Sequence, residues 1–273
     1  LHLIYSQFRT LEGIGILKLV LETNGFAHFK IKKNLAGEWK IAIREEDRGK
    51  PSFALYTGTE SKEEKEIIRN IFNGKWDAIP LSLAKDLEKI SSNNLYGEII
   101  KVLMITASGA EGISLENVRY VHITEPYWHP VRIEQVIGRA RRICSHMALP
   151  KELQTVEVFL YLMKFTKEQM TSEDNKELRN KDKSKIDNKT PYTSDQALYE
   201  ISVIKENINK SILKAVKESS IDCTLYSKEN RKENLQCFIF GNPNPEQLAY
   251  QPSIGVDDAD DVSKANKKKE KRN

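Results

Sequence analysis

The chain has 273 residues, of which 39% are hydrophobic and 30% are charged, and 43 Lys and Arg against 39 Asp and Glu leave a net charge of +4. This composition is typical of a soluble protein with one large domain or two smaller ones. It excludes a membrane protein, because no stretch approaches about 18 consecutive apolar residues. The small positive excess does not by itself indicate a nucleic-acid partner.

The three cysteines, Cys144, Cys223 and Cys237, show no CxxC spacing. They predict neither a disulfide framework nor a metal site, and they favour a reducing, intracellular compartment. The N-terminus lacks the succession of charged, apolar and small residues that marks a signal peptide. Because the sequence begins at Leu1 directly in a strand-like pattern, we expect a fragment of a longer protein or one half of a split enzyme.

The chain opens with a strand-like and then a helix-like pattern. Residues 2–8 form an apolar run that predicts a buried strand. Residues 16–22 show helical periodicity, which Asn24 and Gly25 end as a C-terminal stop signal. A strand followed by a helix is the opening unit of an α/β sheet.

The next segment predicts a β-hairpin. Residues 29–33 and 38–43 alternate in character on either side of the turn-like residues 34–37. We therefore expect a hairpin inserted at the sheet edge, over about residues 28–45.

A second strand and helix follow the hairpin. Residues 52–58 predict a strand, and Thr59 or Ser61 is the expected cap of a helix at 63–72. Strands that alternate with helices predict an α/β fold of three layers, in which helices cover both faces of a mainly parallel sheet. The remaining elements expected before residue 165 are a helix at 81–90, strands at 101–107, 120–124 and 155–162, and a helix at 131–143.

The helix expected at 131–143 has one polar and one apolar side. At about 100° per residue, Gln135, Arg139 and Arg142 fall within about 60° of one another. Guanidinium groups suit phosphate oxygens, which they bind bidentately, but exposed arginines are also common on solvated helix faces. The opposite, packing side is expected to consist of Ile133, Val136, Ile137, Ala140 and Ile143.

Ligands of open parallel sheets bind at the carboxyl ends of the strands, so the loops that follow strands are the candidate sites. Three loops qualify, at residues 6–9, 106–112 and 125–130. The glycines and hydroxyls of 106–112 suit phosphate binding, but taken alone they favour a tight strand-to-helix turn. Tyr127, Trp128 and His129 could stack on a base or cap the core. His122 lies within a strand and is expected to be a core histidine.

Composition changes beyond residue 165. We expect a charged linker at 166–194 and a helical extension of unknown role at 195–255, whose periodic apolar residues predict a helix at 194–219. A strand-like patch lies at 236–240. The tail at 256–273 is acidic and then basic, and it is expected to be disordered; by analogy with basic arms it could also contact nucleic acid.

Taken together, the motifs resemble the second RecA-like domain (the helicase C-terminal domain) of a superfamily 2 helicase. The chain is similar to the Swi/Snf-type translocases, and most similar to the helicases of large DNA viruses that are often tied to viral transcription. The segments that carry this resemblance are 4–8 for motif IV, 56–58 with the following helix for the next block, 105–115 for motif V, and 125–130 with 135–142 for motif VI.

The resemblance implies that Arg139 and Arg142 act as arginine fingers on ATP and that Gln135 links their site to neighbouring motifs. Ser114 departs from the acidic residue of the common helicase pattern and from the amide of the Swi/Snf pattern. The residues expected to lie toward the nucleotide are Gly112, Glu111 and Gly138, and those expected to contact nucleic acid are Ser6, Gln7, Arg9, Thr106, Ser108, Gly109 and Trp128.

The sequence contains no GxxxxGK[ST] loop and no Asp-Glu box. ATP and Mg²⁺ are therefore expected to be bound mainly by a missing N-terminal RecA-like domain, and this chain alone is expected to be inactive. The other expected partners are DNA or RNA and a transcription complex. If the protein is viral, the resemblance implies host cytoplasm, host nucleus or virion. The alternative function is a non-catalytic module that binds nucleic acid or a transcription partner.

Overall fold

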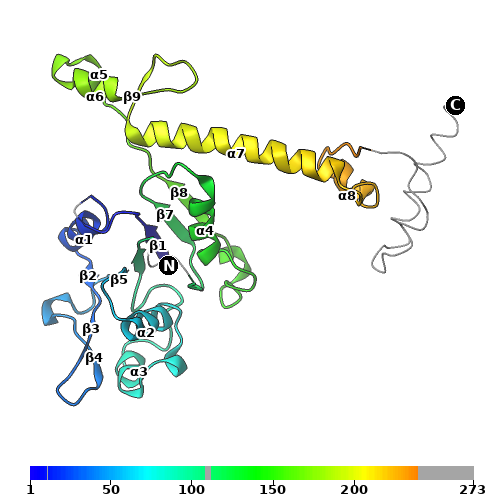
Figure 1. Cartoon of the computed structure of the whole chain (residues 1–273). Coiled ribbons are helices and arrows are strands. Elements are labelled where there is room, and N and C mark those ends of the chain that lie inside the picture. Colours follow the sequence, from blue (N-terminus) through cyan, green and yellow to red (C-terminus); the bar gives the residue numbers. More distant parts are fainter. Residues whose placement is uncertain (11, 108–111, 239–273) are drawn as a thin grey trace, which may run out of the picture. The chain divides into compact units, whose positions relative to one another are not determined.

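The structure, a computed structural model, describes residues 1–10, 12–107 and 112–238 (Figure 1). The chain divides into two compact units, residues 1–202 and residues 203–273. In the described residues, no helix is long and apolar enough to cross a membrane.

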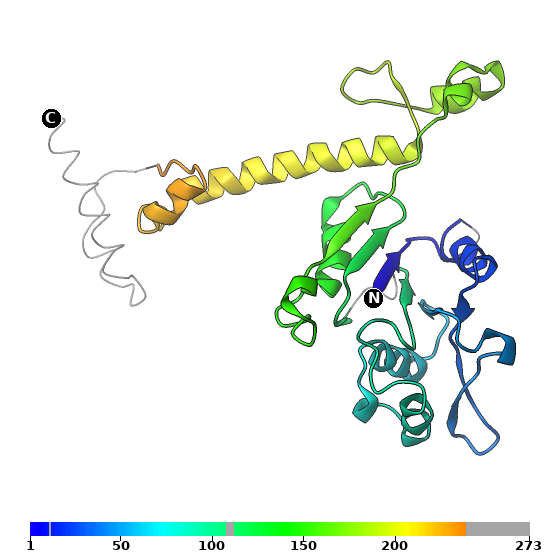
Figure 2. The same cartoon turned by 180° about the vertical axis from the view of Figure 1, so that it is seen from behind.

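The first unit is built on one sheet of six strands in the order β2-β5-β6-β1-β7-β8, and every neighbouring pair is parallel. Figure 2 shows β1, in blue, between green strands that lie far from it in sequence. The predicted α/β fold with a mainly parallel sheet is confirmed. The strands are β1 (His2–Tyr5), β2 (Ala27–His28), β5 (Ser52–Tyr56), β6 (Val102–Ile105), β7 (Tyr120–Ile123) and β8 (Glu157–Leu160).

Helices pack on both faces of the sheet because alternate strand residues point to opposite sides. On one face, Leu3, Leu103 and Val121 are fully buried in the core cluster that includes residues of α2, α3 and α4. On the other face, Met104 packs with Ile14 of α1 in a smaller cluster. The helices of this part are α1 (Ile14–Thr23), α2 (Lys62–Phe72), α3 (Leu81–Glu88) and α4 (Pro130–Ala140), with short 3-10 turns at Glu45–Asp47, Trp76–Ala78 and Lys151–Leu153.

The predicted hairpin forms, but outside the main sheet. β3 (Ile31–Lys33) and β4 (Trp39–Ile41) make a separate antiparallel pair, and the edge of the main sheet is β2. The Asn34 side chain accepts hydrogen bonds from the backbone of Ala36 and Glu38, which fixes the turn. The hairpin is thus inserted next to the edge strand β2, between β2 and β5 in the sequence, as predicted, but its strands pair only with each other.

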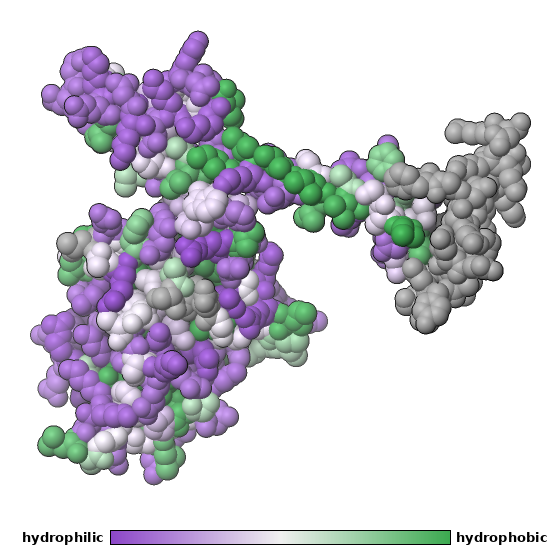
Figure 3. Space-filling model, viewed as in Figure 1, coloured by the Kyte–Doolittle hydropathy of each residue, from purple (hydrophilic) through white to green (hydrophobic). Residues whose placement is uncertain are grey.

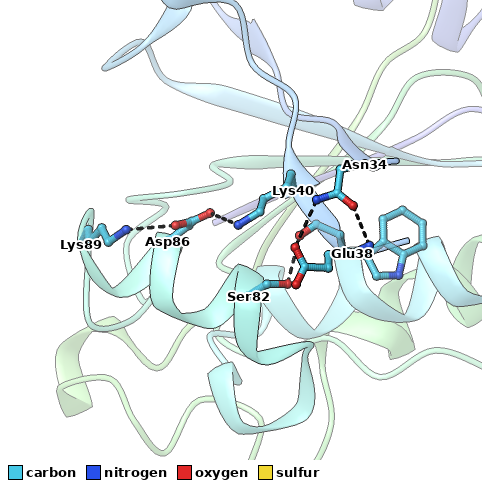
Figure 4. A network of polar contacts seen from close by, with 7 residues as sticks. Asn34, Glu38, Lys40, Ser82, Asp86 and Lys89 are labelled. Carbon is cyan, nitrogen blue, oxygen red and sulfur yellow. Dashed lines mark hydrogen bonds and ion pairs between the residues drawn. The ribbon is translucent and has the colours of Figure 1, made fainter. Parts of the chain in front are cut away.

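Polar contacts join the hairpin to α3 (Figure 4). The Ser82 hydroxyl donates to the carbonyl of Trp39 at 3.1 Å. Asp86 lies 3.5 Å from Lys40 of β4 and 3.1 Å from Lys89. The hairpin is thus held on the helical layer and not by the ladder of the main sheet.

Two helix ends test the predictions made from capping signals. Ser61, one of the two expected caps, accepts a hydrogen bond from the backbone N–H of Glu64 and begins α2. The helix predicted at 131–143 ends earlier, at Ala140. Ile143, expected on the packed side, is consequently 97% exposed.

Beyond β8 the chain forms short elements and then one long helix. The helix predicted at 194–219 is confirmed as α7 (Ser194–Ser219). Figure 3 shows hydrophobic residues along one side of α7, and Ile208, Ile212 and Val216 are more than half exposed. The remaining elements are α5 (Lys167–Thr171), a 3-10 turn at Glu173–Asn175, α6 (Lys176–Lys181), β9 (Asp182–Lys183), β10 (Pro191–Tyr192) and α8 (Ser227–Lys232).

The cysteine prediction was wrong for one pair. Cys223 and Cys237 form a disulfide, with Cα atoms 5.5 Å apart, whereas Cys144 is free and exposed. The two cysteines meet because the chain turns back after α8, where the N–H of Phe238 donates to the carbonyl of Glu218. In the patch predicted as a strand, residues 236–238 have no strand pairing, and the rest of that patch lies outside the described residues, as does the tail at 256–273.

Candidate functional site

The carboxyl ends of the central strands lie at one edge of the sheet, here called the rim. The parallel register sets Tyr5 of β1 opposite Ile105 of β6 and Ile123 of β7. The loops that follow these three strands therefore start from the same edge, as predicted. This geometry brings together the starts of motifs IV and V and the segment 125–130 that precedes motif VI.

α4 begins at the rim and carries part of motif VI away from it, towards the opposite edge of the sheet, where residues 145 and 146 contact residues 117 and 118 just before β7. His129 caps the helix by accepting a hydrogen bond from the N–H of Val131, and Pro130 occupies its first turn. Gln135 is exposed, and a Cβ added to Gly138 would meet nothing within 4 Å. The side that packs against the sheet consists of Val136, Ile137 and Ala140, with Ile133 partly buried beside them.

The prediction that Arg142 shares a helical face with Gln135 and Arg139 was wrong, because Arg142 lies outside the helix. Arg141 has φ −103° and ψ 75°, which ends the helix. The Ser145 hydroxyl donates to the carbonyls of Ala140 and Arg142 and so satisfies backbone groups at this end. The guanidinium of Arg142 instead donates through Nη1 to the hydroxyl of Ser114.

Motif V and motif VI are joined by a second contact, between backbones. The N–H of Leu115 donates to the carbonyl of Arg139 at 3.2 Å. Ile113 and Leu115 are buried, which fixes the segment between β6 and β7 against the core. Arg139 itself is partly buried, and its Nε lacks a hydrogen-bond partner. Among the described residues, neither Arg139 nor Arg142 forms an ion pair with a carboxylate.

The motif V loop is described only at its two ends. Thr106 is 3% exposed at the end of β6. Gly112 has φ 72°, a left-handed conformation that favours glycine, and it is exposed. Three further candidates, Ser108, Gly109 and Glu111, lie outside the described residues.

The loop after β1, residues 6–10, here called the β1 loop, contains the motif IV candidates. Ser6 is fully buried, whereas Gln7 is partly exposed and Arg9 is exposed. The Ser6 hydroxyl donates to Glu125 Oε1 at 2.6 Å, and the N–H of Gln7 donates to the same oxygen at 2.6 Å. Sequence reasoning did not single out Glu125, although its position directly after β7 and at the start of residues 125–130 was a signal.

An aromatic group lies between β7 and α4. Trp128 is 45% exposed, with its ring edge-on to His129 at 5.6 Å. The Arg132 guanidinium lies over the ring of Tyr127, 4.6 Å from its centroid. A cation above one ring, next to a second exposed ring, is an arrangement that suits the stacking of a base.

His122, expected to be a core histidine, is half-buried in β7. Its Nε2 lies 3.1 Å from Nδ1 of His2, and its Nδ1 lies 2.9 Å from the hydroxyl of Tyr161. Burial lowers the pKa of His122, which keeps the ring neutral near pH 7. Its hydrogen bonds and its ring stacking, 5.2 Å from Phe159, give it a packing role on the sheet face away from α4.

Comparison with known proteins agrees with these motifs. Residues 81–144 match the helicase conserved C-terminal domain. A protein of Acanthamoeba polyphaga mimivirus whose name describes an ATP-dependent RNA helicase is 31% identical over 261 residues, which cover 95% of this chain and 26% of that protein. A termination factor NPH-I homologue of African swine fever virus is 30% identical over 244 residues, covering 81% of this chain and 30% of that protein.

Among solved structures, the C-terminal part of the Fun30 ATPase domain superposes with a TM-score of 0.36 at 16% identity, covering 77% of this chain and 48% of that chain. The sequence matches confirm the resemblance drawn from the motifs: the chain carries a helicase C-terminal domain, and its relatives include ATP-dependent helicases of large DNA viruses. The chain spans less than a third of the length of either viral relative.

Proposed function

We propose that this chain, which carries a helicase C-terminal domain, supplies the second half of an ATP-dependent nucleic-acid helicase or translocase. The observation that carries the proposal is the junction of motifs V and VI. There the backbone carbonyl of Arg139 accepts from the N–H of Leu115, and the guanidinium of Arg142 donates to the hydroxyl of Ser114. Neither guanidinium group forms an ion pair with a carboxylate among the described residues. Such groups are available to an anionic ligand.

In this proposal, Arg139 and Arg142 bind the γ-phosphate of ATP held by an N-terminal RecA-like domain. ATP and Mg²⁺, bound mainly by that domain, supply the phosphoryl chemistry. Fixed guanidinium groups stabilise the charge that develops on the transferred phosphoryl group, and arginine fingers of this kind accelerate hydrolysis by about 10³ or more. The unpartnered Nε of Arg139 fits a phosphate ligand, because a buried N–H without an acceptor is costly. Gln135, Gly138, Gly112 and Glu111 complete this wall of the site.

The nucleic acid would cross the rim over the β1 loop and the aromatic group. Gln7 and Arg9 would contact backbone phosphates, with Thr106, Ser108 and Gly109 from motif V, and Trp128 would stack on a base. The hydroxyl of Ser6 already donates to Glu125, so Ser6 would act by holding the loop. The strand bound is DNA or RNA, and the viral relatives support a role in a transcription complex.

Arg139→Ala in the full-length protein tests the proposal. We expect nucleic-acid-stimulated ATP hydrolysis to fall by about 10³, because one finger is lost. Arg141→Ala is the matched control, since this exposed neighbour has no contact with motif V among the described residues; its activity should stay near wild type. Equal rates for Arg139→Ala and wild type would overturn the finger assignment.

The isolated chain gives a second test. Because it holds only one wall of the proposed site, it should hydrolyse no ATP. A nucleic-acid-binding measurement on the same sample tests the alternative function, a module that only binds. For such a module, the isolated chain would bind nucleic acid in a salt-dependent way, and the full-length protein would show no ATP hydrolysis stimulated by nucleic acid.

A further inference from the structure

Glu125 connects two loops that sequence reasoning treated as separate. Its Oε1 accepts a hydrogen bond from the Ser6 hydroxyl and another from the N–H of Gln7, each at 2.6 Å. Its Oε2 contacts the hydroxyl of Thr124. Bonds to an ionised carboxylate are stronger than bonds between neutral groups, so this is a firm attachment between β1 and β7 at the rim.

The β1 loop is also restrained by hydrogen bonds within the loop and by the start of α1. The Ser6 hydroxyl has one proton, which it donates to Glu125, while it accepts from the N–H of Phe8 at 3.1 Å. The carbonyl of Phe8 accepts from the N–H of Ile14 at 3.0 Å. A Cβ on Gly13 would lie 2.1 Å from that carbonyl oxygen, so the start of α1 approaches the loop as closely as a glycine allows. The loop is therefore held by the start of α1 on one side and by Glu125 on the other.

The other side of the contact leads directly into α4. Glu125 is followed by residues 126–129, which include the exposed Trp128, and then by Pro130 at the start of the helix that carries Arg139. Loss of the Glu125 contacts would consequently allow the β1 loop to move relative to Trp128 and to α4, which carries Arg139.

We propose that Glu125 is a positioning residue, which holds the β1 loop on residues 125–130 so that the nucleic-acid contacts of both loops keep one spacing. The assignment rests on the proposed function. Glu125 touches neither ATP nor nucleic acid; it acts through Gln7 and Trp128. Its loss should therefore weaken nucleic-acid engagement more than it weakens the ATP site.

The side-chain chemistry separates three variants. Glu125→Ala removes the acceptor for both donors. Glu125→Gln keeps one oxygen at the same reach but removes the charge, so it should restore part of the effect. Ser6→Ala removes one donor from the opposite loop and tests the same attachment from that side. Glu134→Gln is the control, because Glu134 is exposed on α4 and has no ion pair among the described residues.

The experiment uses the full-length protein and a nucleic acid that stimulates the wild type. We expect Glu125→Ala to raise the half-saturating nucleic-acid concentration about tenfold and Glu125→Gln about threefold, while the KM for ATP changes less than about twofold. Ser6→Ala should cause a rise that adds little to that of Glu125→Ala in the double variant, because both remove one attachment. Glu134→Gln should behave as wild type.

Several results would overturn the assignment. One is an unchanged half-saturating concentration in Glu125→Gln and Ser6→Ala. Another is a parallel loss of nucleic-acid affinity, ATP affinity and melting temperature in every variant, which would mean a purely structural role. If Glu125→Ala does not fold, Glu125→Gln and Ser6→Ala still decide the question. If the wild type shows no ATP hydrolysis stimulated by nucleic acid, the proposed function itself fails. If the wild type is stimulated and the variants behave like it, only the role of Glu125 fails.

Discussion

Asn94 makes four backbone hydrogen bonds in the segment before β6, where it is 1% exposed. Its Nδ2 donates to the carbonyls of Phe72 at 2.9 Å and Ile100 at 3.0 Å. Its Oδ1 accepts from the N–H groups of Ile99 at 2.8 Å and Ile100 at 3.0 Å. In Asn94→Ala all four backbone groups lose a buried partner. At about 1 kcal/mol for each bond, the free energy of unfolding should fall by about 4 kcal/mol.

Such a loss is a large part of the stability of a domain, which is typically about 5–15 kcal/mol. Urea unfolding should show a lower midpoint for Asn94→Ala with an unchanged slope, because the surface exposed on unfolding is the same. The matched control is Asn93→Ala, a partly exposed neighbour that accepts one backbone hydrogen bond, from Leu95 at 3.0 Å, and should cost at most about 1 kcal/mol. If the two variants lose the same free energy, the account of Asn94 as a buried structural amide is refuted.

Two glycines and one histidine give the remaining predictions. Gly13→Ala places a Cβ 2.1 Å from the backbone carbonyl oxygen of Phe8 and should lower thermal stability by about 1–3 kcal/mol. The added Cβ of Gly138→Ala meets nothing within 4 Å inside α4, so this variant should raise the free energy of unfolding by about 0.5–1 kcal/mol. Equal melting temperatures for the two glycine variants would contradict both predictions. Burial lowers the pKa of His28 to about 4 from the ordinary 6.5, so the unfolded chain binds a proton that the folded chain does not. Stability should therefore be full above pH 6.5 and fall by about 1–2 kcal/mol as the pH drops towards 4, allowing for partial exposure. Urea midpoints measured between pH 4 and 6.5 should depend less on pH in His28→Gln than in wild type. The same pH dependence in both proteins would contradict this role of His28.

The parts of the fold that follow from local patterns could be predicted from the sequence. The alternation of apolar strands with periodic helices predicts the parallel sheet, because such strands must be buried on both faces. The Ser61 cap needs only residues within one turn of it, so its signal is local. The rim follows from the same reasoning, since parallel strands end at one edge.

The parts that depend on distant residues could not be predicted. α4 ends at Ala140 because the hydroxyl of Ser145 satisfies the carbonyls there, and the periodic pattern continues past that point to Ile143. The hairpin leaves the sheet because α3 holds it through contacts such as that of Ser82, and no local pattern specifies this partner. The disulfide between Cys223 and Cys237 depends likewise on the turn of the chain after α8.

Two sets of contacts connect the segments to which the proposed function assigns the nucleotide and the nucleic acid. Leu115 and Ser114 attach motif V to motif VI, and Glu125 attaches the β1 loop to the lead-in of the same helix. Ser114 is neutral where the helicase pattern has an acidic residue, and its hydroxyl accepts a hydrogen bond from the guanidinium of Arg142 without forming an ion pair. A carboxylate at this position would instead pair with the guanidinium and reduce its attraction for a phosphate. In the proposed function, the hydroxyl leaves the charge of Arg142 available to a phosphate, while its contact holds the guanidinium beside motif V.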